Sequence, residues 1–270
     1  MAASCHWADV HASEQTMLVP QTPSFRLDGR RALVTGASRG IGFALAASLA
    51  QAGAQVTLCA RTAATLQAAT AAIRAQGGDA DALVLDVTDA GATKQAIGAL
   101  QPVDILVNCA GTNRPSPFLE VSETDFDELI HLNVRAAFFV AQAVAARMVA
   151  AGIAGSIINI SSQAGHVAAP GRSVYTATKF AIEGITKVMA VELAPHRIRV
   201  NSLCPTFIET EMTRPALSDP AFRSTVLAKI KLGRFGTVED LMGAVQFLAS
   251  DASSLMTGSS LLIDGGWTAG

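Results

Sequence analysis

The sequence lacks any cysteine pattern typical of a disulfide framework or a metal cluster. Its four cysteines, Cys5, Cys59, Cys109 and Cys204, are far apart and form neither a CxxC motif nor a Cys/His ligand spacing. We therefore expect reduced thiols, three of them on or beside strands. Reduced thiols in turn favour a cytoplasmic location.

An excess of charge of either sign is also missing. The formal net charge is -2, and basic and acidic residues are spread along the whole chain. No basic stripe is present that would neutralise nucleic-acid phosphates, and no polybasic segment that would bind a membrane surface. We expect a small-molecule substrate and other protein chains as partners, with no nucleic acid and no membrane.

No long hydrophobic run is uninterrupted. The N-terminal segment carries Asp9 and Glu14 and has no apolar run after a basic start, so it does not look like a secretory signal. The most apolar long stretch begins at Ala136 and is broken by Gln142 and Arg147. This composition favours a buried core helix over a membrane span.

Residues 1–26 show neither helical nor strand periodicity and contain two prolines. We expect a mobile tail or an arm packed on a neighbouring chain. The segment also contains Cys5, His6 and His11, but two histidines and a thiol without a fourth ligand do not predict a metal site. No metal site is predicted elsewhere in the chain.

From Arg31 onward, short apolar runs alternate with longer alanine-rich helical stretches. Each run is nearly continuous in apolar residues and is bounded by glycine, proline or a polar turn, which is typical of a strand buried on both faces. The runs are RALVT (31–35), AQVTLCA (54–60), DALVLDV (81–87), VDILVNCA (103–110), GSIINIS (155–161), IRVNSLC (198–204) and SLLIDGG (260–266). Helices of this length allow right-handed crossovers, so we predict a single doubly wound α/β domain with a seven-stranded parallel sheet and helices on both faces.

A glycine-rich loop, TGASRGIG (35–42), follows the first predicted strand and leads directly into a helix. Glycines at positions 36, 40 and 42 permit a tight turn, close approach of the backbone to a pyrophosphate, and close packing of helix on strand. The helix N-terminus supplies unpaired N–H groups to the phosphates. In this context the loop predicts a dinucleotide site, whereas alone it would be weak evidence.

The end of the second predicted strand indicates which dinucleotide binds. An acidic residue there would bind the ribose 2′-hydroxyl, and a basic one would accommodate a 2′-phosphate. This chain has Ala60 and Arg61 at that point, and Arg39 lies in the glycine loop. Two arginines and no acid favour NADP(H) over NAD(H), although a solvated surface charge would be the default interpretation of either arginine alone.

By these features the chain resembles the short-chain dehydrogenase/reductase family from Phe25 to Gly270. The motifs that carry the resemblance are TGASRGIG (35–42), LDV (85–87), NCAG (108–111), LNV (132–134), NISS (159–162), YTATK (175–179), RVNSLCPT (199–206) and DGG (264–266). The resemblance implies a Rossmann-type catalytic domain over residues 27–270. It departs from the family pattern at Cys109, where asparagine is usual, and at Thr206, where glycine is usual.

The resemblance implies a catalytic tetrad of Asn133, Ser162, Tyr175 and Lys179. Ser162 fits better than Ser161 because the family's serine lies thirteen residues before the tyrosine. Reduction of a carbonyl builds negative charge on oxygen, so the site needs a proton donor and a hydrogen-bond donor, roles that Tyr175 and Ser162 can fill. Lys179, one turn along the same helix face, is placed to favour the phenolate. In the family, the lysine also holds the nicotinamide ribose and the asparagine positions a water.

The resemblance also implies which residues line the cofactor. They are Gly36, Ser38, Arg39, Gly40, Ile41, Gly42, Arg61, Asp86, Val87, Asn108, Ala110, Gly111, Tyr175, Lys179, Pro205, Thr206, Ile208 and Thr210. Asp86 is expected to contact the adenine, and the residues after the fourth strand are expected to line the rest of the dinucleotide.

Substrate specificity in such folds lies on loops, here residues 112–121, 163–173 and 206–236. The last is rich in proline and mixed charge, which is typical of a mobile lid. Four loop residues are candidates to line the substrate pocket: Arg114, Gln163, His166 and Phe207. Arg114 can meet a carboxylate or phosphate, and Gln163 and His166 can hydrogen-bond hydroxyls, although surface roles for all four are equally consistent with the sequence.

Residues 111–121 resemble members that act on sugar acids or polyols, while the general layout also resembles 3-oxoacyl thioester reductases. We favour a small polar carbonyl or secondary alcohol as substrate. A regulator that senses NADP(H) without turnover is the alternative of another class, and the intact tetrad argues against it. The long apolar helices and an exposed Trp267 suggest subunit packing, and the resemblance implies a homotetramer or homodimer.

Overall fold

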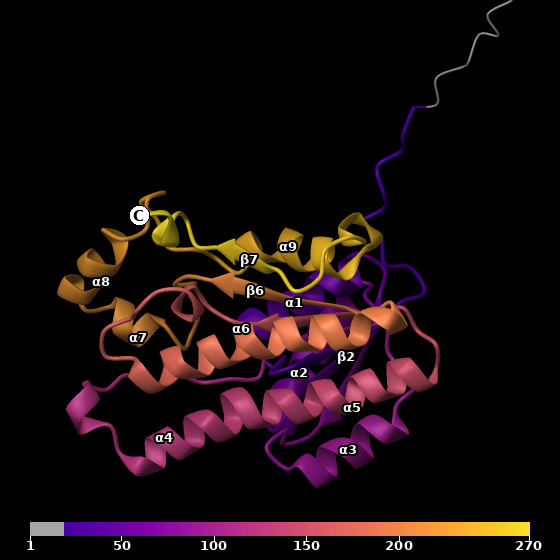
Figure 1. The fold of residues 1–270 in the computed structure, drawn as a ribbon, viewed down its shortest axis with the longest axis horizontal. Helices are drawn as coiled ribbons and strands as arrows, with labels where there is room; N and C mark the ends of the chain where they lie inside the picture. Colours follow the sequence, from indigo (N-terminus) through magenta and orange to yellow (C-terminus); the bar gives the residue numbers. More distant parts are fainter. Residues whose placement is uncertain (1–18) are drawn as a thin grey trace, which may run out of the picture.

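The computed structural model describes residues 19–270, in which seven parallel strands form one sheet in the order β3-β2-β1-β4-β5-β6-β7 (Figure 1). The strands are β1 (Arg31–Thr35), β2 (Gln55–Ala60), β3 (Ala80–Val84), β4 (Ile105–Asn108), β5 (Ser156–Ile160), β6 (Arg199–Pro205) and β7 (Ser260–Ile263). Each lies within or beside one of the predicted apolar runs, so the predicted sheet is confirmed. Cys5, His6 and His11 lie outside the described residues.

The predicted runs 81–87 and 260–266 extend furthest beyond the ends of their strands, by three residues each. β3 ends at Val84, so Asp86 lies two residues past the strand rather than at its end. β7 ends at Ile263 because the Asp264 carboxylate accepts hydrogen bonds from the N–H groups of Gly266 and Thr268 and turns the chain. Both strands are sheet edges and are partly exposed, in contrast to the predicted burial on both faces.

Helices cover both faces of the sheet. One face is covered by α1 (Gly40–Gln51), α2 (Ala63–Ala75) and α9 (Glu239–Ala249), and the other by α3 (Ala90–Ala99), α5 (Ala137–Ala150) and α6 (Ser173–Leu193) (Figure 1). Successive strand residues point to opposite faces, so Val34 packs under the first group of helices and Leu33 under the second. The short helical turns are Phe118–Glu120, Gln163–Gly165, Ala194–His196, Asp251–Ser253 and Trp267–Ala269.

One continuous helical stretch, Glu123–Ala150, comprises α4 (Glu123–Ile130), a π-helical segment η2 (His131–Ala136) and α5. By length and composition it is apolar enough to cross a membrane, and 39% of its most apolar window is buried inside the protein. In Figure 1 it lies alongside α6 and α3, as a covering helix of a sheet does. Core helices of globular proteins meet the same criterion, so the stretch is weak evidence for a membrane.

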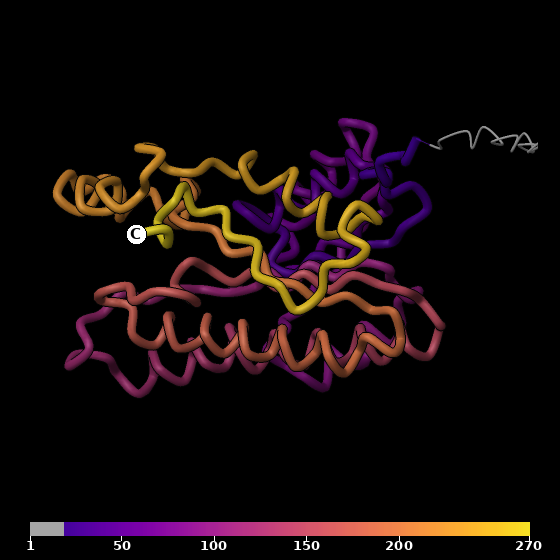
Figure 2. The backbone as a smooth tube through the Cα atoms, turned by 45° about the horizontal axis from the view of Figure 1, so that its top comes forward, coloured from indigo at the N-terminus to yellow at the C-terminus, as the bar shows by residue number. Residues whose placement is uncertain are grey.

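The segment 206–236, predicted as a mobile lid, contains two short helices joined by turns and irregular backbone. It contains α7 (Arg214–Leu217) and α8 (Pro220–Leu227), and Figure 2 shows it at the same end of the molecule as the C-terminus. Its apolar side chains form a small core of their own, with Trp267 packed against it. Trp267 stacks on Phe207, with ring centroids 5.7 Å apart, and is partly buried rather than fully exposed.

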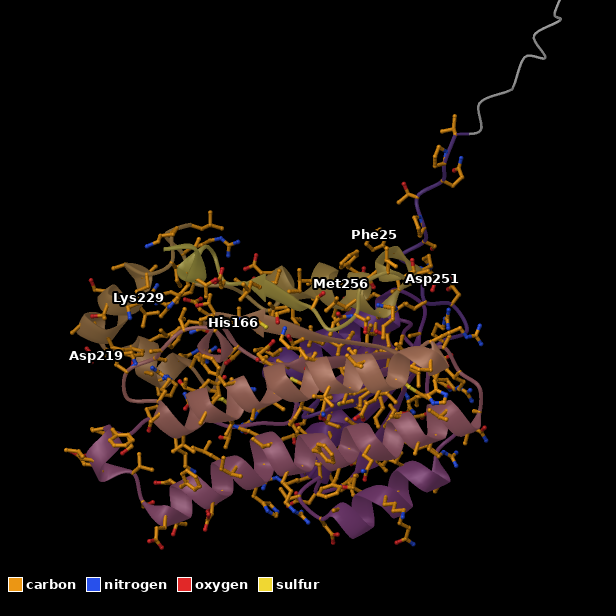
Figure 3. All side chains as sticks on the ribbon, in the orientation of Figure 1. Phe25, His166, Asp219, Lys229, Asp251 and Met256 are labelled. Atoms are coloured by element: carbon orange, nitrogen blue, oxygen red, sulfur yellow. The ribbon has the colours of Figure 1, made fainter. Side chains whose placement is uncertain are left out.

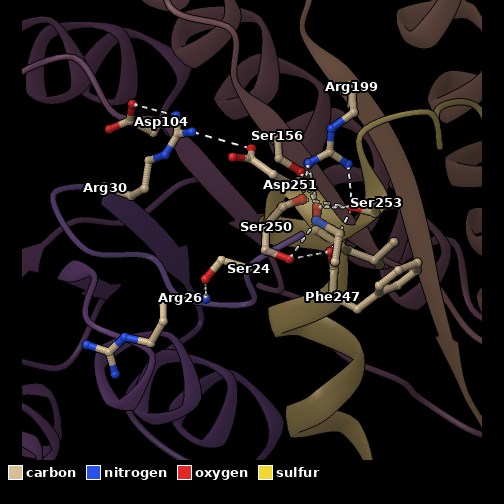
Figure 4. Close-up of polar contacts among 12 residues, drawn as sticks. Ser24, Arg26, Arg30, Asp104, Ser156, Arg199, Phe247, Ser250, Asp251 and Ser253 are labelled. Atoms are coloured by element: carbon tan, nitrogen blue, oxygen red, sulfur yellow. Dashed lines mark hydrogen bonds and ion pairs between the residues drawn. The ribbon is translucent and has the colours of Figure 1, made fainter. Parts of the chain in front are cut away.

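Polar contacts join the segments at the amino ends of β1, β4 and β6 (Figure 4). The Arg199 guanidinium donates to Ser253 Oγ at 2.7 Å and to the carbonyl oxygens of Leu248 and Ser250. Arg30 bridges Asp104 and Asp251 at 3.6 and 3.5 Å. These contacts join β6 to the end of α9 and leave the carboxyl ends of the strands free for a site.

Candidate active site

A cleft of about 540 Å³ lies at the carboxyl ends of the strands. The glycine loop forms one wall, and two of its glycines are required by geometry. Gly36 has a φ of +67°, and a Cβ there would lie 2.9 Å from the Ala110 Cα. A Cβ at Gly42 would collide with the Gly36 carbonyl oxygen. The backbone can therefore approach a bound dinucleotide and present the α1 N-terminus to its phosphates.

Most residues expected to contact the cofactor line this cleft. They are Gly36, Ser38, Arg39, Gly40, Ile41, Gly42, Arg61, Asp86, Val87, Ala110, Gly111, Tyr175, Lys179, Pro205, Thr206 and Thr210. Asn108 and Ile208 are buried and do not line it. The Asn108 amide instead donates to the Ala137 carbonyl oxygen at 2.7 Å and so joins β4 to α5.

The cleft has further wall residues that the sequence analysis did not name. Among them are Thr62, Thr65, Asn113 and Glu211. Thr62 and Thr65 follow β2 directly, and Asn113 lies two residues after the NCAG motif. Their positions after strand ends could have indicated that they line the cleft, but their residue types are not distinctive of a cofactor site.

The two arginines expected at the ribose lie on the same cleft and are both largely exposed. Arg39 is 3.7 Å from Glu211, and Arg61 is 4.0 Å from Asp86. Burial raises the pKa of Asp86, but hydrogen bonds from Thr88 outweigh this effect, with help from Arg61, and the net pKa lies below its usual value. The two arginine heads are loosely paired, so a phosphate can compete for them.

Tyr175 and Lys179 lie one turn apart on α6 and both line the cleft. The Lys179 ammonium donates to the Ile160 carbonyl oxygen at 2.8 Å and is 5.4 Å from the centre of the Tyr175 ring. Lys179 is buried, and the carbonyl group fixes its head at the end of β5. The charge is therefore held beside the phenol.

The two serines after β5 face different partners. Ser162 Oγ donates to Gln163 Oε1 at 2.6 Å and accepts from the Ala164 N–H. Ser161 Oγ lies beside the Glu183 carboxylate and favours its charge, but it makes no hydrogen bond of normal geometry. The expected assignment of the catalytic role to Ser162 is consistent with this arrangement.

Asn133 lies in the π-helical segment η2 and is buried. Its amide nitrogen donates to the Thr112 carbonyl oxygen at 2.8 Å, and its amide oxygen accepts from the Thr112 N–H at 2.9 Å. The amide nitrogen is also 3.3 Å from Thr178 Oγ1 on α6. Asn133 therefore joins η2, the loop after β4 and the helix that carries Tyr175.

The four candidate substrate residues have different surroundings. Arg114 pairs with Asp125 at 3.4 Å and with Glu128, so its charge is already compensated. Gln163 is buried and holds Ser162, and Phe207 packs between Trp267 and Phe222. None of the four lines the dinucleotide cleft itself.

A cluster of one exposed and two buried polar side chains lies beside Ser161. His166, near the end of β6 in Figure 3, has its Nε2 3.8 Å from Glu183 Oε2, and Cys204 Sγ lies 3.4 Å from the same carboxylate. Among residues 19–270 these three bring ligand atoms within 4.8 Å of one another, in a set that zinc accepts. The sequence did not indicate this grouping because its members come from three separate segments.

The Glu183 carboxylate is satisfied by neighbouring hydroxyls. Burial raises its pKa, but hydrogen bonds from Ser260, Ser202 and Cys204 outweigh burial, and the net pKa lies below its usual value. The same burial, with the Glu183 charge beside it, raises the pKa of Cys204 to about 12. This cysteine is therefore held as a thiol, as expected from the sequence.

Comparisons with known proteins agree with this geometry. The family model described as enoyl-(acyl carrier protein) reductase matches residues 36–268. D-erythrulose reductase from Gallus gallus is 44% identical over 245 residues, which cover 91% of this chain and 98% of that protein. Gluconate 5-dehydrogenase from Gluconobacter oxydans is 45% identical over 248 residues, which cover 90% of this chain and 96% of that protein.

Among solved structures, a gluconate 5-dehydrogenase from Burkholderia cenocepacia in complex with NADP and tartrate is similar, with a TM-score of 0.88 and 40% identity over 91% of this chain and 98% of that one. The chain belongs to the short-chain dehydrogenase/reductase family and is an oxidoreductase. The predicted resemblance is thereby confirmed.

Proposed function

We propose that the protein transfers hydride between NADP(H) and the carbonyl or secondary alcohol carbon of a small polyhydroxylated substrate. One observation carries this proposal: Ser162, Tyr175 and Lys179 line the same cleft as the glycine loop that would hold the dinucleotide phosphates. A proton donor, a hydrogen-bond donor and a fixed cation thus surround one point at the end of β5.

NADP(H), when bound, supplies or accepts the hydride. During reduction the Tyr175 hydroxyl donates its proton to the substrate oxygen, and the Lys179 ammonium stabilises the phenolate that remains. Ser162 donates a hydrogen bond to the same oxygen, for which its hydroxyl turns away from Gln163 Oε1. Asn133 keeps the loop at Thr112 in place, so that Gly111 can line the cofactor.

Preference for NADP(H) over NAD(H) follows from the residues around the expected adenosine ribose. No carboxylate ends β2, and Arg39 and Arg61 lie on the cleft within reach of a 2′-phosphate. Their ion pairs at 3.7 and 4.0 Å are too long for strong hydrogen bonds and can be exchanged for a phosphate. The Burkholderia relative was crystallised with NADP, which supports this preference.

A sugar-type substrate is supported by the relatives, whose names refer to erythrulose and gluconate. The tartrate in the Burkholderia complex is likewise a hydroxylated carbon chain. In this protein, His166 is partly exposed beside the site and can hydrogen-bond a hydroxyl. A 3-oxoacyl thioester reductase is the alternative, and its substrate would have to bind through a long apolar arm.

We further propose a homotetramer or homodimer in the cytoplasm, without nucleic-acid or membrane partners. The support is an apolar surface on α4, α5 and α6 that includes Phe126, Phe138, Phe180, Val188 and Val191, all substantially exposed. A second subunit would cover this surface.

The test of the proposed function is the oxidation of NADPH and NADH by the purified full-length protein. The panel contains sugar ketones, keto-sugar acids, simple ketones and 3-oxoacyl thioesters, with Tyr175→Phe as the inactive control. We expect tyrosine-dependent NADPH oxidation with the sugar-type group. Turnover of thioesters alone would favour the alternative, and tight NADPH binding without turnover of any compound would favour a cofactor-sensing role.

A further inference from the structure

We propose that Arg172 binds a carboxylate of the substrate and thereby selects hydroxy or keto acids over neutral sugars. The inference deepens the proposed function and rests on it. Arg172 immediately precedes α6, three residues before Tyr175, and the sequence analysis did not single it out. The geometry of its side chain distinguishes it from Arg114, which was the expected carboxylate ligand.

The guanidinium of Arg172 lies against two aromatic rings. Its Cζ is 5.0 Å from the centroid of Phe207 and 5.4 Å from that of Phe222, and these two rings are 5.8 Å apart in an edge-to-face arrangement. Aromatic faces favour a guanidinium and restrict its rotation. The planar head is therefore oriented before any substrate arrives.

The backbone of Arg172 is also fixed. Its N–H donates to the Ala169 carbonyl oxygen at 3.1 Å, and its carbonyl oxygen accepts from the Thr176 N–H at 2.8 Å. A short parallel bridge joins Arg172 to Ser116, on the loop that follows β4. The backbone of Arg172 is thus held by α6, which carries Tyr175, and by two of the predicted substrate loops.

No anion among the described residues compensates this charge. Throughout residues 19–270, no carboxylate lies within 4.0 Å of the Arg172 guanidinium nitrogens, and its side chain makes no hydrogen bond to another residue. By contrast, Arg114 has Asp125 and Glu128 as partners. Arg172 is half-buried, and burial lowers its pKa, while the only ionisable group acting against this effect is Tyr175.

A half-buried guanidinium with five unused donors is an anion site. Its flat fork binds both oxygens of a carboxylate, which a neutral ketose cannot offer. Phe207 comes directly after Thr206, which lines the cofactor cleft, so the guanidinium on the Phe207 ring lies near the wall of that cleft.

The separation of Arg172 and Tyr175 indicates the kind of acid. Arg172 lies outside α6, and its guanidinium lies on Phe207 and Phe222, which do not line the cleft that Tyr175 lines. A carboxylate on Arg172 and a reacting oxygen on Tyr175 must then belong to carbons separated by several bonds. We assign the substrate class as aldonic acids oxidised, or keto-aldonates reduced, at a carbon remote from the carboxylate.

The first experiment compares oxidation of D-gluconate and D-glucitol with NADP⁺ by the full-length protein. Gluconate has a carboxylate at the position where glucitol has a hydroxymethyl group. We expect Arg172→Gln to raise the KM for gluconate about ten- to a hundredfold and to leave glucitol kinetics within about twofold. Arg172→Lys keeps the charge but not the fork and should recover part of the loss. Arg114→Gln is the matched control and should show no selectivity for charge.

A role of Arg172 limited to holding the two phenylalanines would give a different result. Both substrates would then be impaired alike, and the fluorescence of Trp267, which stacks on Phe207, would change in Arg172→Gln. Equal effects on gluconate and glucitol, or none on gluconate, would overturn the proposal.

Calorimetric binding separates this proposal from the proposed function. Tartrate and its neutral counterpart threitol are titrated into the NADP⁺ complex of the protein and of Arg172→Gln. We expect Arg172→Gln to lower the affinity for tartrate at least about tenfold, as for the KM of gluconate. If neither polyol nor acid is turned over, the proposed function fails, whereas tartrate binding that is insensitive to Arg172 refutes the carboxylate site.

Discussion

The ammonium of Lys179 lies 5.4 Å from the centre of the Tyr175 ring while it donates to the Ile160 carbonyl oxygen. This arrangement places a fixed positive charge beside the only tyrosine in the chain. The cation is anchored to the sheet and not to a mobile loop, so its effect on the phenol does not depend on substrate binding.

Tyr175→Phe is expected to lower kcat by a factor of at least about 10² to 10⁴, because it removes the proton donor and leaves the ring in place. The affinity for NADPH, measured by fluorescence titration, should remain nearly unchanged. Turnover close to that of the original protein would contradict the assignment of Tyr175.

The two adjacent serines provide a matched pair. Ser162→Ala should lower kcat by about 10² to 10³, the usual loss for one donor to a developing oxyanion. Ser161→Ala should change kcat by no more than a few-fold, since Ser161 Oγ lies beside Glu183. Steady-state kinetics with the best substrate of the panel tests both, and the reverse order of effects would exchange the roles of the two serines.

Arg61→Ala should raise the KM for NADPH about ten- to a hundredfold and change the KM for NADH little, because only NADPH carries the 2′-phosphate. Arg39→Ala should act in the same direction and less strongly. Arg74 on α2 pairs with Asp81 outside the cleft, so Arg74→Ala is the control for the loss of a surface charge. Equal losses for both cofactors would refute the 2′-phosphate role.

Glu183→Gln is expected to destabilise the fold by about 1–3 kcal/mol at pH 7, because it removes a buried charge that accepts three hydrogen bonds. The folded-state pKa lies below the ordinary value of 4.5. Its stabilising contribution is therefore complete above about pH 4.5 and is lost as the pH falls through the lower folded-state pKa. Urea denaturation at pH 7 and pH 3.5 should show a smaller difference between the two proteins at the lower pH.

A charge on the exposed apolar surface of α6 should weaken subunit association. Val191 is 76% exposed and Phe180 is 51% exposed, so Val191→Glu and Phe180→Glu are the variants of choice. Sedimentation analysis should find the unmodified protein as a dimer or tetramer and the variants as smaller species. Val84→Glu, on the edge strand β3 at the other end of the sheet order, is the control, since Val84 is 51% exposed. An unmodified protein that sediments as a monomer would refute the assembly.

The sheet was predictable because buried parallel strands read as nearly continuous apolar runs. The strand ends were less predictable, as at β3, where Leu85 still donates to the Ala60 carbonyl oxygen but the ladder has ended. The small core inside the segment 206–236 was not predicted, because proline and mixed charge hide its apolar side chains, among them Leu217, Val226 and Phe235.

The candidate site was predictable where a motif fixes both residue and backbone, as in the glycine loop. Loop side chains were not, because their partners come from elsewhere in the fold. Arg114 carried the expected charge, but the acids that pair with it lie on the following helix, at Asp125 and Glu128. Arg172 lies within the predicted substrate loop 163–173. Only its positive charge, three residues before Tyr175, could have singled it out.

The π-helical segment His131–Ala136 makes the length of this helix as important as its composition. A π turn contains one more residue than an α turn, so the loss of one residue would allow an uninterrupted α-helix. The wide turn takes up the extra residue, so α4 and α5 keep the phase of an uninterrupted helix. A deletion in the regular α-helix on either side would instead rotate everything before it by about 100°, and in the first turns of α5 this would carry the acids of α4 away from Arg114. Between Glu123 and Ala150, natural variants should therefore tolerate a single-residue deletion only within His131–Ala136.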